Sequence, residues 1–226
     1  EGTNHFLYAG YFDGFEGRLT TADDRFSGKA VPLLLEFELR KLHGRSAYNG
    51  VGHIQYFLDS ENHPHPHVTV DETLEYMATE LAFGHTGLVT KAVLPDYDHS
   101  LSQAVMEEKY VLPIQELYGK ARAVTITYFD SQGSKSASQY IADHMERFDD
   151  LRSAEFMGKI RVAYDNGVIV YVNRTAEPWA VSLKTGAGGW YSYHLLIGGK
   201  TTLGTGTLSG ATVILPPESG WVAYIP

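Results

Sequence analysis

The sequence predicts an α/β protein in which alternating strands and helices, residues 1–155, precede a small antiparallel β-sandwich domain, residues 156–226. Three observations support this fold class. Before residue 155, strand-like and helix-like patterns alternate, as they do in βα units. After it, short apolar runs are separated by glycine-rich turns, which is typical of antiparallel sandwiches. The segment 148–158 between them is charged and aperiodic and ends in a glycine, so we place the domain boundary there.

In the first region, the earliest clear elements are a strand and a helix. Residues 31–39 form a continuous apolar run that turns into alternation, which predicts a strand buried on both faces. Thr69 and Glu72 have the spacing of a capping box, and the helix that they begin is expected to end at Gly84 or Gly87. The expected buried face of this helix carries Leu74, Met77, Leu81 and Ala82.

A second helix is predicted over residues 100–119, followed by a strand over residues 124–129. Pro113 must kink or divide this helix, because proline lacks an amide hydrogen and clashes with the preceding turn. The expected apolar positions of the helix are Leu101, Ala104, Val105 and Leu112. The strand alternates, with Val124, Ile126 and Tyr128 expected on one face.

The second region begins with a predicted β-hairpin. Residues 159–164 and 168–173 flank Asp165-Asn166-Gly167, and Asn-Gly between two β runs is a strong hairpin pattern because both residues tolerate positive φ. We therefore expect Asn166→Val to destabilise the hairpin by about 1–2 kcal/mol through a forced positive φ. Further strands are predicted over residues 179–183, 190–196, 201–207, 211–215 and 221–225.

The composition excludes several classes of protein. The 226 residues include 27 acidic and 18 basic side chains, a net charge of −9, which argues against nucleic acid and against a polybasic membrane anchor as partners. No apolar run approaches the roughly 18 residues of a membrane span. The chain has no cysteine, which excludes disulfides, a thiol nucleophile and cysteine-ligated metals.

The length of the first region limits what it can build. A complete (β/α)₈ barrel takes roughly 250 residues, about 30 for each unit, so about 155 residues hold four or five units. Two alternatives follow: either the region is a different α/β layer, or the chain is the carboxyl-terminal part of a larger barrel protein.

Several segments resemble the carboxyl-terminal part of bacterial (β/α)-barrel glycoside hydrolases and their uncharacterised relatives. They are Glu1-Gly2, His5–Gly14, Val31–Glu36, Tyr76–His85, Glu107–Tyr118, Val168–Arg174 and Leu215–Ala223. The resemblance implies a partial, incomplete (β/α)-barrel-like region followed by the small β domain that closes such chains. It also implies hydrolysis of a glycan through paired carboxylates, and it favours a secreted or periplasmic location. The earlier barrel strands, where one of the two carboxylates often lies, are not in this chain.

The candidate catalytic residues are carboxylates. Glu36 and Glu38 are two apart on the predicted strand, so they share a face with Cα atoms roughly 7 Å apart. Glycosidases hold their two carboxyl groups about 5–9.5 Å apart, and Glu36 is near the carboxyl end of its strand. Asp13 lies in an aromatic stretch that would raise its pKa, and Glu1 is a candidate through the resemblance. The alternative is that Glu36 and Glu38 form structural ion pairs with nearby arginine and lysine side chains.

The candidate substrate-binding residues are Glu38, Asn49, His53 and Tyr56. Asn49, His53 and Tyr56 fall in the long loop after the strand of Glu36, where their polar groups could contact sugar hydroxyls. Loop packing is the alternative. Trp179, Trp190, Tyr191 and Tyr193 could form a sugar-stacking platform, although such residues more often belong to a sandwich core.

We expect neither a metal nor a cofactor. His63, His65 and His67 alternate with prolines, which extend the chain and keep three imidazoles from converging on one ion. The expected partner is carbohydrate. Three hypotheses stay open: a glycoside hydrolase, a non-catalytic carbohydrate-binding or assembly module, and a structural half-barrel that self-associates or is completed by a second chain.

Overall fold

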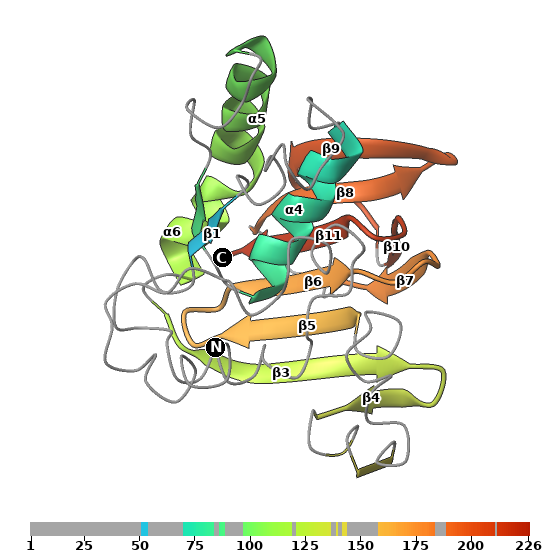
Figure 1. Cartoon of the computed structure of the whole chain (residues 1–226). Helices are drawn as coiled ribbons and strands as arrows, with labels where there is room; N and C mark the ends of the chain where they lie inside the picture. The colour runs from blue at the N-terminus through green and yellow to red at the C-terminus, as the bar shows by residue number, and fades with distance from the viewer. Residues whose placement is uncertain are drawn as a thin grey trace, which may run out of the picture.

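The computed structural model describes residues 51–53, 70–83, 86–88, 97–118, 121–136, 139, 142–143, 158–183, 189–210 and 212–226. Its main element is a nine-stranded sheet in which every pairing is antiparallel (Figure 1). The helices of the described part lie against this sheet. The predicted α/β class is therefore wrong: the described residues form a mostly antiparallel, curled half-barrel and not a (β/α)-barrel region.

The sheet contains strands from both predicted regions. Its strands are β3 (Ala123–Asp130), β4 (Gly133–Lys135), β5 (Lys159–Tyr164), β6 (Ile169–Asn173), β7 (Trp179–Ser182), β8 (Trp190–Ile197), β9 (Lys200–Gly206), β10 (Thr212–Leu215) and β11 (Gly220–Ile225). Their order is β4-β3-β5-β6-β11-β8-β10-β7, with β9 on the side of β8. Because β3 pairs directly with β5, the sheet contains strands from both sides of residue 155.

The strands after residue 158 follow their predicted positions to within one or two residues. They alternate as the sequence pattern requires. In β6, Val170 and Val172 face the helices, whereas Tyr171 faces the other way. In β11, Trp221 and Ala223 share the helix side, whereas Val222 lies with Tyr171. The sheet thus has two different faces, which we call the helix-covered face and the outer face.

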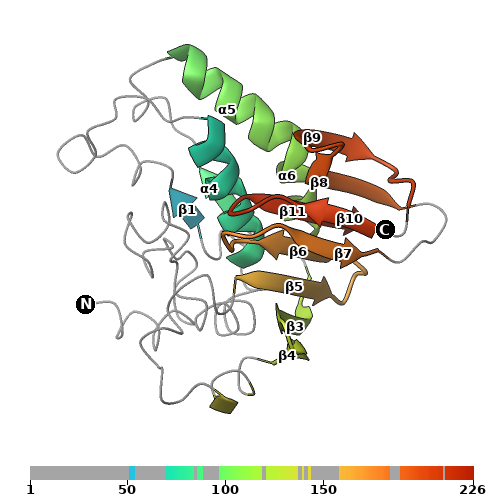
Figure 2. The same ribbon diagram turned by 90° about the vertical axis from the view of Figure 1, so that its right-hand side faces the viewer.

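The helix-covered face holds the larger core. It is covered by α4 (Val70–Phe83), which packs on β5, β6 and β11, as Figure 2 shows, and by α6 (Leu112–Tyr118). The predicted helix over residues 69–84 is confirmed. All four of its expected core residues are buried: Leu74, Met77, Leu81 and Ala82.

The second predicted helix is divided, as Pro113 requires. It forms α5 (Tyr97–Tyr110) and α6, with Pro113 in the first turn of α6, where a missing amide hydrogen is tolerated. Two of the apolar positions, Val105 and Leu112, are 52% and 39% exposed. The division rotates α6 relative to α5, so one helical periodicity does not describe both.

The predicted strand over residues 124–129 is confirmed as β3, with one change of face. Ile126 and Tyr128 are buried on the helix-covered face, but Val124 is 56% exposed. The pairing of β3 with β5 shifts between Ala123 and Thr125. This bulge turns Val124 away from the core, since an extra residue in one strand reverses the side-chain alternation beyond it.

The hairpin between β5 and β6 is confirmed, but its turn differs from the expectation. Gly167 has a φ of 89°, whereas Asn166 is not among the residues with positive φ. Gly167 N donates to Tyr164 O, and Tyr164 N donates to the carbonyl oxygen of Val168, as in a three-residue turn with a glycine bulge. Asn166 acts through its side chain: Nδ2 donates to Leu117 O of α6 and Oδ1 accepts from Val168 N. A forced positive φ is therefore not the reason to expect damage from Asn166→Val.

The outer face is partly covered by the sheet itself. β7 pairs with β10, and residues of both strands pack with Tyr171, Val222 and Leu195 in a second core. This packing curls the sheet. Separately, β1 (Val51–His53) and β2 (Thr86–Leu88) pair in parallel, with α4 between them in the chain. These two strands form a small parallel sheet that is separate from the nine-stranded antiparallel sheet.

Candidate functional site

Most of the predicted site residues fall outside the described part of the chain. The candidate catalytic residues Glu36, Glu1 and Asp13 lie there, and so do the candidate binding residues Glu38, Asn49 and Tyr56. His53 is the last residue of β1, where it pairs with Leu88 of β2. Their proposed roles stay predictions.

The helix-covered face contains a cluster of buried ionisable groups. Glu80 of α4 is 1% exposed, and Tyr118 of α6 and Tyr164 of β5 stack with ring centroids 5.5 Å apart. Burial, assisted by the charge of Glu80, raises the pKa of Glu107 in α5 to about 8. Burial also raises the pKa of both tyrosines. At neutral pH, Glu107 is therefore protonated.

A protonated carboxyl beside a second carboxyl is the pair that acid catalysis uses. Here, however, the surrounding groups are closed to a ligand, because Tyr118, Tyr164 and Glu80 are 0%, 3% and 1% exposed. A sugar would have to displace the helices to reach these atoms. We interpret the cluster as part of the core and not as a site.

His194 and Ser219 also lie close together without forming a reactive pair. His194 Nδ1 is 2.8 Å from the carbonyl of Ser219, which can only accept, so Nδ1 carries the proton. The Ser219 hydroxyl is 3.5 Å from the same nitrogen. Because a protonated nitrogen cannot take a proton from the hydroxyl, this arrangement does not activate Ser219 as a nucleophile.

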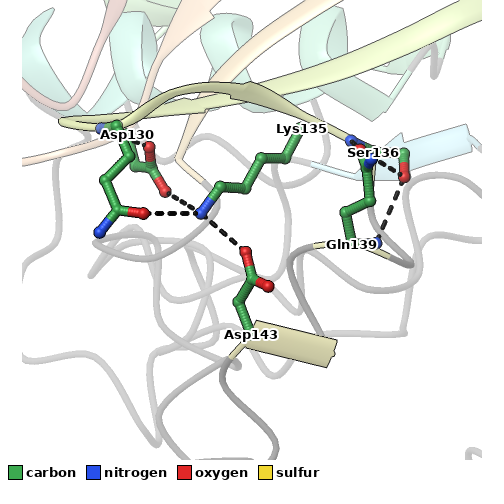
Figure 3. Close-up of polar contacts among 6 residues, drawn as sticks. Asp130, Lys135, Ser136, Gln139 and Asp143 are labelled. Atoms are coloured by element: carbon green, nitrogen blue, oxygen red, sulfur yellow. Dashed lines mark hydrogen bonds and ion pairs between the residues drawn. The ribbon is translucent and has the colours of Figure 1, made fainter.

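Near the β3–β4 turn, an ammonium group bridges two carboxylates. Lys135 Nζ lies 3.0 Å from Asp130 Oδ2 and 2.8 Å from Asp143 Oδ2 (Figure 3). Burial alone would raise the pKa of Asp130, but hydrogen bonds from Lys135 and Gln132 lower it. Among the described residues, no group of three or more histidine, aspartate or glutamate side chains could hold a metal ion.

The outer face carries a row of half-buried aromatic rings with an arginine. Trp179, the first residue of β7, contacts Phe129 of β3 at a centroid distance of 5.1 Å and Tyr171 of β6 at 6.0 Å. Arg161 of β5 lies directly opposite Tyr171 in the ladder. Its guanidinium lies 5.8 Å from the Tyr171 ring centroid, and its Nε donates to the Tyr171 hydroxyl at 3.2 Å. We call these four residues the aromatic–arginine site.

Such a site combines two kinds of contact. The ring faces present apolar, weakly negative surface, which suits the C–H groups on the face of a pyranose. The arginine and the tyrosine hydroxyl can exchange hydrogen bonds with ring hydroxyls. All four side chains are partly exposed, so a ligand can reach them without unfolding the sheet.

The predicted stacking platform of Trp179, Trp190, Tyr191 and Tyr193 does not form as a unit. Trp190 points to the helix-covered side and is 63% exposed, whereas Tyr191 is 7% exposed. The ring of Tyr193 lies against Gly204 of β9, where an added Cβ would come within 2.5 Å of it. Of these four residues, Trp179 alone joins the aromatic–arginine site.

Sequence reasoning missed Arg161, Tyr171 and Phe129. The hairpin register could have identified the first two, because the turn at 165–167 places residue 161 opposite residue 171. Phe129 required the tertiary structure, since it meets Trp179 only after the sheet curls.

Comparisons with known proteins identify no family. No family model matches the chain, and no curated protein matches it. Among solved structures, it is similar to an α-amylase from Geobacillus thermoleovorans, solved in complex with acarbose, at 10% identity and a TM-score of 0.43. The match covers 100% of this chain and 51% of the amylase, so the chain spans about half the length of that protein. This distant structural likeness assigns neither a family nor a catalytic residue. No helix among the described residues is long and apolar enough to span a membrane.

Proposed function

We propose that this chain belongs to a carbohydrate-active protein of the glycoside hydrolase type and that its sheet recognises glycans through the outer face. One observation carries the proposal: Trp179 lies between Phe129 and Tyr171 on an accessible face, beside an arginine. The three rings are partly buried, Trp179 and Tyr171 against the second core, and each keeps some surface that a ligand can contact. The sequence resemblance to glycoside hydrolases supports the same conclusion.

Recognition by this site is expected to be weak. A single pair of rings and a few hydrogen bonds give millimolar affinity, roughly −4 kcal/mol. Such affinity suits a surface that holds a polymeric substrate through repeated contacts.

The test measures the binding of oligosaccharides to the 226-residue chain, either by calorimetry or by the NMR chemical shifts of the indole N–H groups. Trp179→Ala should weaken binding at least about tenfold, because the variant removes the ring that contacts both neighbours. Trp190→Ala is the matched control, since Trp190 is exposed on the opposite side of the sheet. Equal loss in both variants, or no binding of any oligosaccharide by the folded chain, would contradict the proposal.

The hydrolytic step is part of the same proposal. Its carboxylates would be Glu36 with Glu1 or Asp13, and Asn49, His53 and Tyr56 would hold the sugar, with Glu38 nearby. Export from the cell, as the resemblance implies, also belongs to this proposal. The check is release of the phenol from aryl glycosides by the chain. Loss of that release in Glu36→Gln, with binding retained, would separate catalysis from recognition.

A further inference from the structure

We propose that the outer face selects acidic glycans, and that Arg161 binds the carboxylate of a hexuronic acid residue. This inference rests on the proposed function and names the class of sugar that the aromatic–arginine site takes. It depends on how Arg161 is held and on the charges around it.

In the described structure, the Arg161 side chain is held by one neighbouring residue, Tyr171. Its Nε donates to the Tyr171 hydroxyl, and its guanidinium lies over the same ring. Among the described residues, Arg161 makes no other hydrogen bond and no ion pair. Both terminal nitrogens of the guanidinium therefore remain available on an accessible face.

This geometry suits a carboxylate. The two terminal nitrogens of arginine present parallel N–H groups that match the two oxygens of a carboxylate, and the resulting pair is stronger and more directional than a bond to a neutral hydroxyl. Because Nε is already fixed by Tyr171, less side-chain freedom is lost on binding.

A second cation lies on the same face. Lys159 is two residues before Arg161 on β5, so the two side chains point the same way with Cα atoms roughly 7 Å apart. Lys159 forms no ion pair in the described part of the chain. Lys159 is opposite Asn173, whose side chain is engaged with the carbonyls of Glu177 and Pro216.

Among the described residues, the neighbouring acidic side chains form no ion pair with Arg161 or Lys159. Asp130, at the end of β3, is paired with Lys135. Glu177, just before Trp179, is exposed and forms no ion pair in the described structure. Within the part of the chain that the structure describes, Arg161 and Lys159 therefore have no ion-pair partner, and together they create a local positive potential in a chain whose net charge is −9.

The contacts that Tyr171 makes with both Arg161 and Trp179 set the expected mode of binding. Tyr171 contacts both of them, so one sugar ring can stack on the aromatic row while its carboxylate, or that of the next residue, reaches the guanidinium. Neutral sugars would keep the stacking and lose the charged contact.

The experiment compares acidic oligosaccharides with their methyl esters, which have the same skeleton without the charge. Galacturonate, glucuronate and mannuronate oligomers are titrated into the 226-residue chain by calorimetry at low and moderate salt. The acid form of at least one oligomer should bind about tenfold more tightly than its ester. Arg161→Gln should remove that ratio, Arg161→Lys should keep part of it, and Lys159→Gln should reduce it less.

Lys200→Gln, an exposed lysine of β9 away from the site, is the matched charge control and should leave the ratio unchanged. Circular dichroism confirms that each variant is folded. If acid and ester bind equally, or if the ratio survives in Arg161→Gln, the selectivity is wrong while glycan recognition stands. If neither form nor any neutral oligosaccharide binds, the proposed function itself fails.

Discussion

The two faces of the sheet use similar aromatic and polar residues in opposite ways. On the helix-covered face, Trp221, Tyr128 and Tyr118 are fully buried, and the Glu80 carboxyl group is buried with them. On the outer face, Trp179, Tyr171 and Phe129 stay half exposed beside a charged arginine. The first face stabilises the fold. The second face is the better candidate for recognition, because its side chains have surface left for a ligand.

The largest expected effect comes from the buried indole of the helix-covered face. Trp221→Ala should lower the free energy of unfolding by about 3–5 kcal/mol, because it removes the largest fully buried side chain and leaves a cavity. Chemical denaturation measures the change. Trp190→Ala, which removes an indole that is 63% exposed, should change stability by less than about 0.5 kcal/mol. Similar losses of unfolding free energy in the two variants would contradict the expected difference between a buried and an exposed indole.

The next effect is a pH dependence from Glu107. Its pKa is about 8 in the folded protein and near 4.5 when exposed. Between these values the folded state holds a proton that the unfolded state has released, so stability falls as the pH rises, by at most about 1.4 kcal/mol per pH unit.

Glu107→Gln should remove this dependence and stabilise the protein at pH 8.5 by about 2–3 kcal/mol, since a neutral amide replaces a carboxyl that resists ionisation. Thermal unfolding between pH 5 and 9 measures it. Glu108→Gln, at the exposed neighbouring position, is the control and should leave the pH profile unchanged. A flat profile for the unmodified protein would contradict the burial of Glu107.

A smaller effect is expected at the β5–β6 turn. Asn166→Ala should destabilise by about 1 kcal/mol, because it removes bonds to Leu117 O and Val168 N. Asn166→Asp keeps an acceptor for Val168 N and loses only the donor to α6, so it should lose less stability. Equal losses of stability in the two variants would show that the hydrogen bond from Asn166 to Leu117 O of α6 accounts for the whole effect.

The smallest effect concerns His194. Burial lowers its pKa below 6.5, although the bond to Ser219 and the charge of Asp71 oppose this shift. A lowered folded pKa means that stability is present above about pH 6.5 and is lost as the pH falls. NMR titration should give a pKa below 6.5, and Asp71→Asn should lower it further. A measured pKa above 6.5 would mean that the charge of Asp71 outweighs burial.

The local elements could be predicted from the sequence wherever the hydrophobic pattern and the turn chemistry agree. The helix that begins near Thr69, the break at Pro113 and the strands after residue 158 follow from capping, from the missing amide of proline and from alternation. These are properties of neighbouring residues, so they need no knowledge of the rest of the chain.

Which faces of those elements pack together could not be predicted locally, because it depends on contacts between distant parts of the chain. The pairing of β3 with β5 across residue 155, the bulge that exposes Val124 and the meeting of Phe129 with Trp179 all join residues far apart in the sequence. The α/β prediction failed for the same reason: the local patterns of a strand and a helix do not specify which strands pair. The raised pKa of Glu107 likewise depends on the tertiary structure, which buries this side chain and brings it near Glu80 of α4. The local sequence around Glu107 does not indicate a raised pKa.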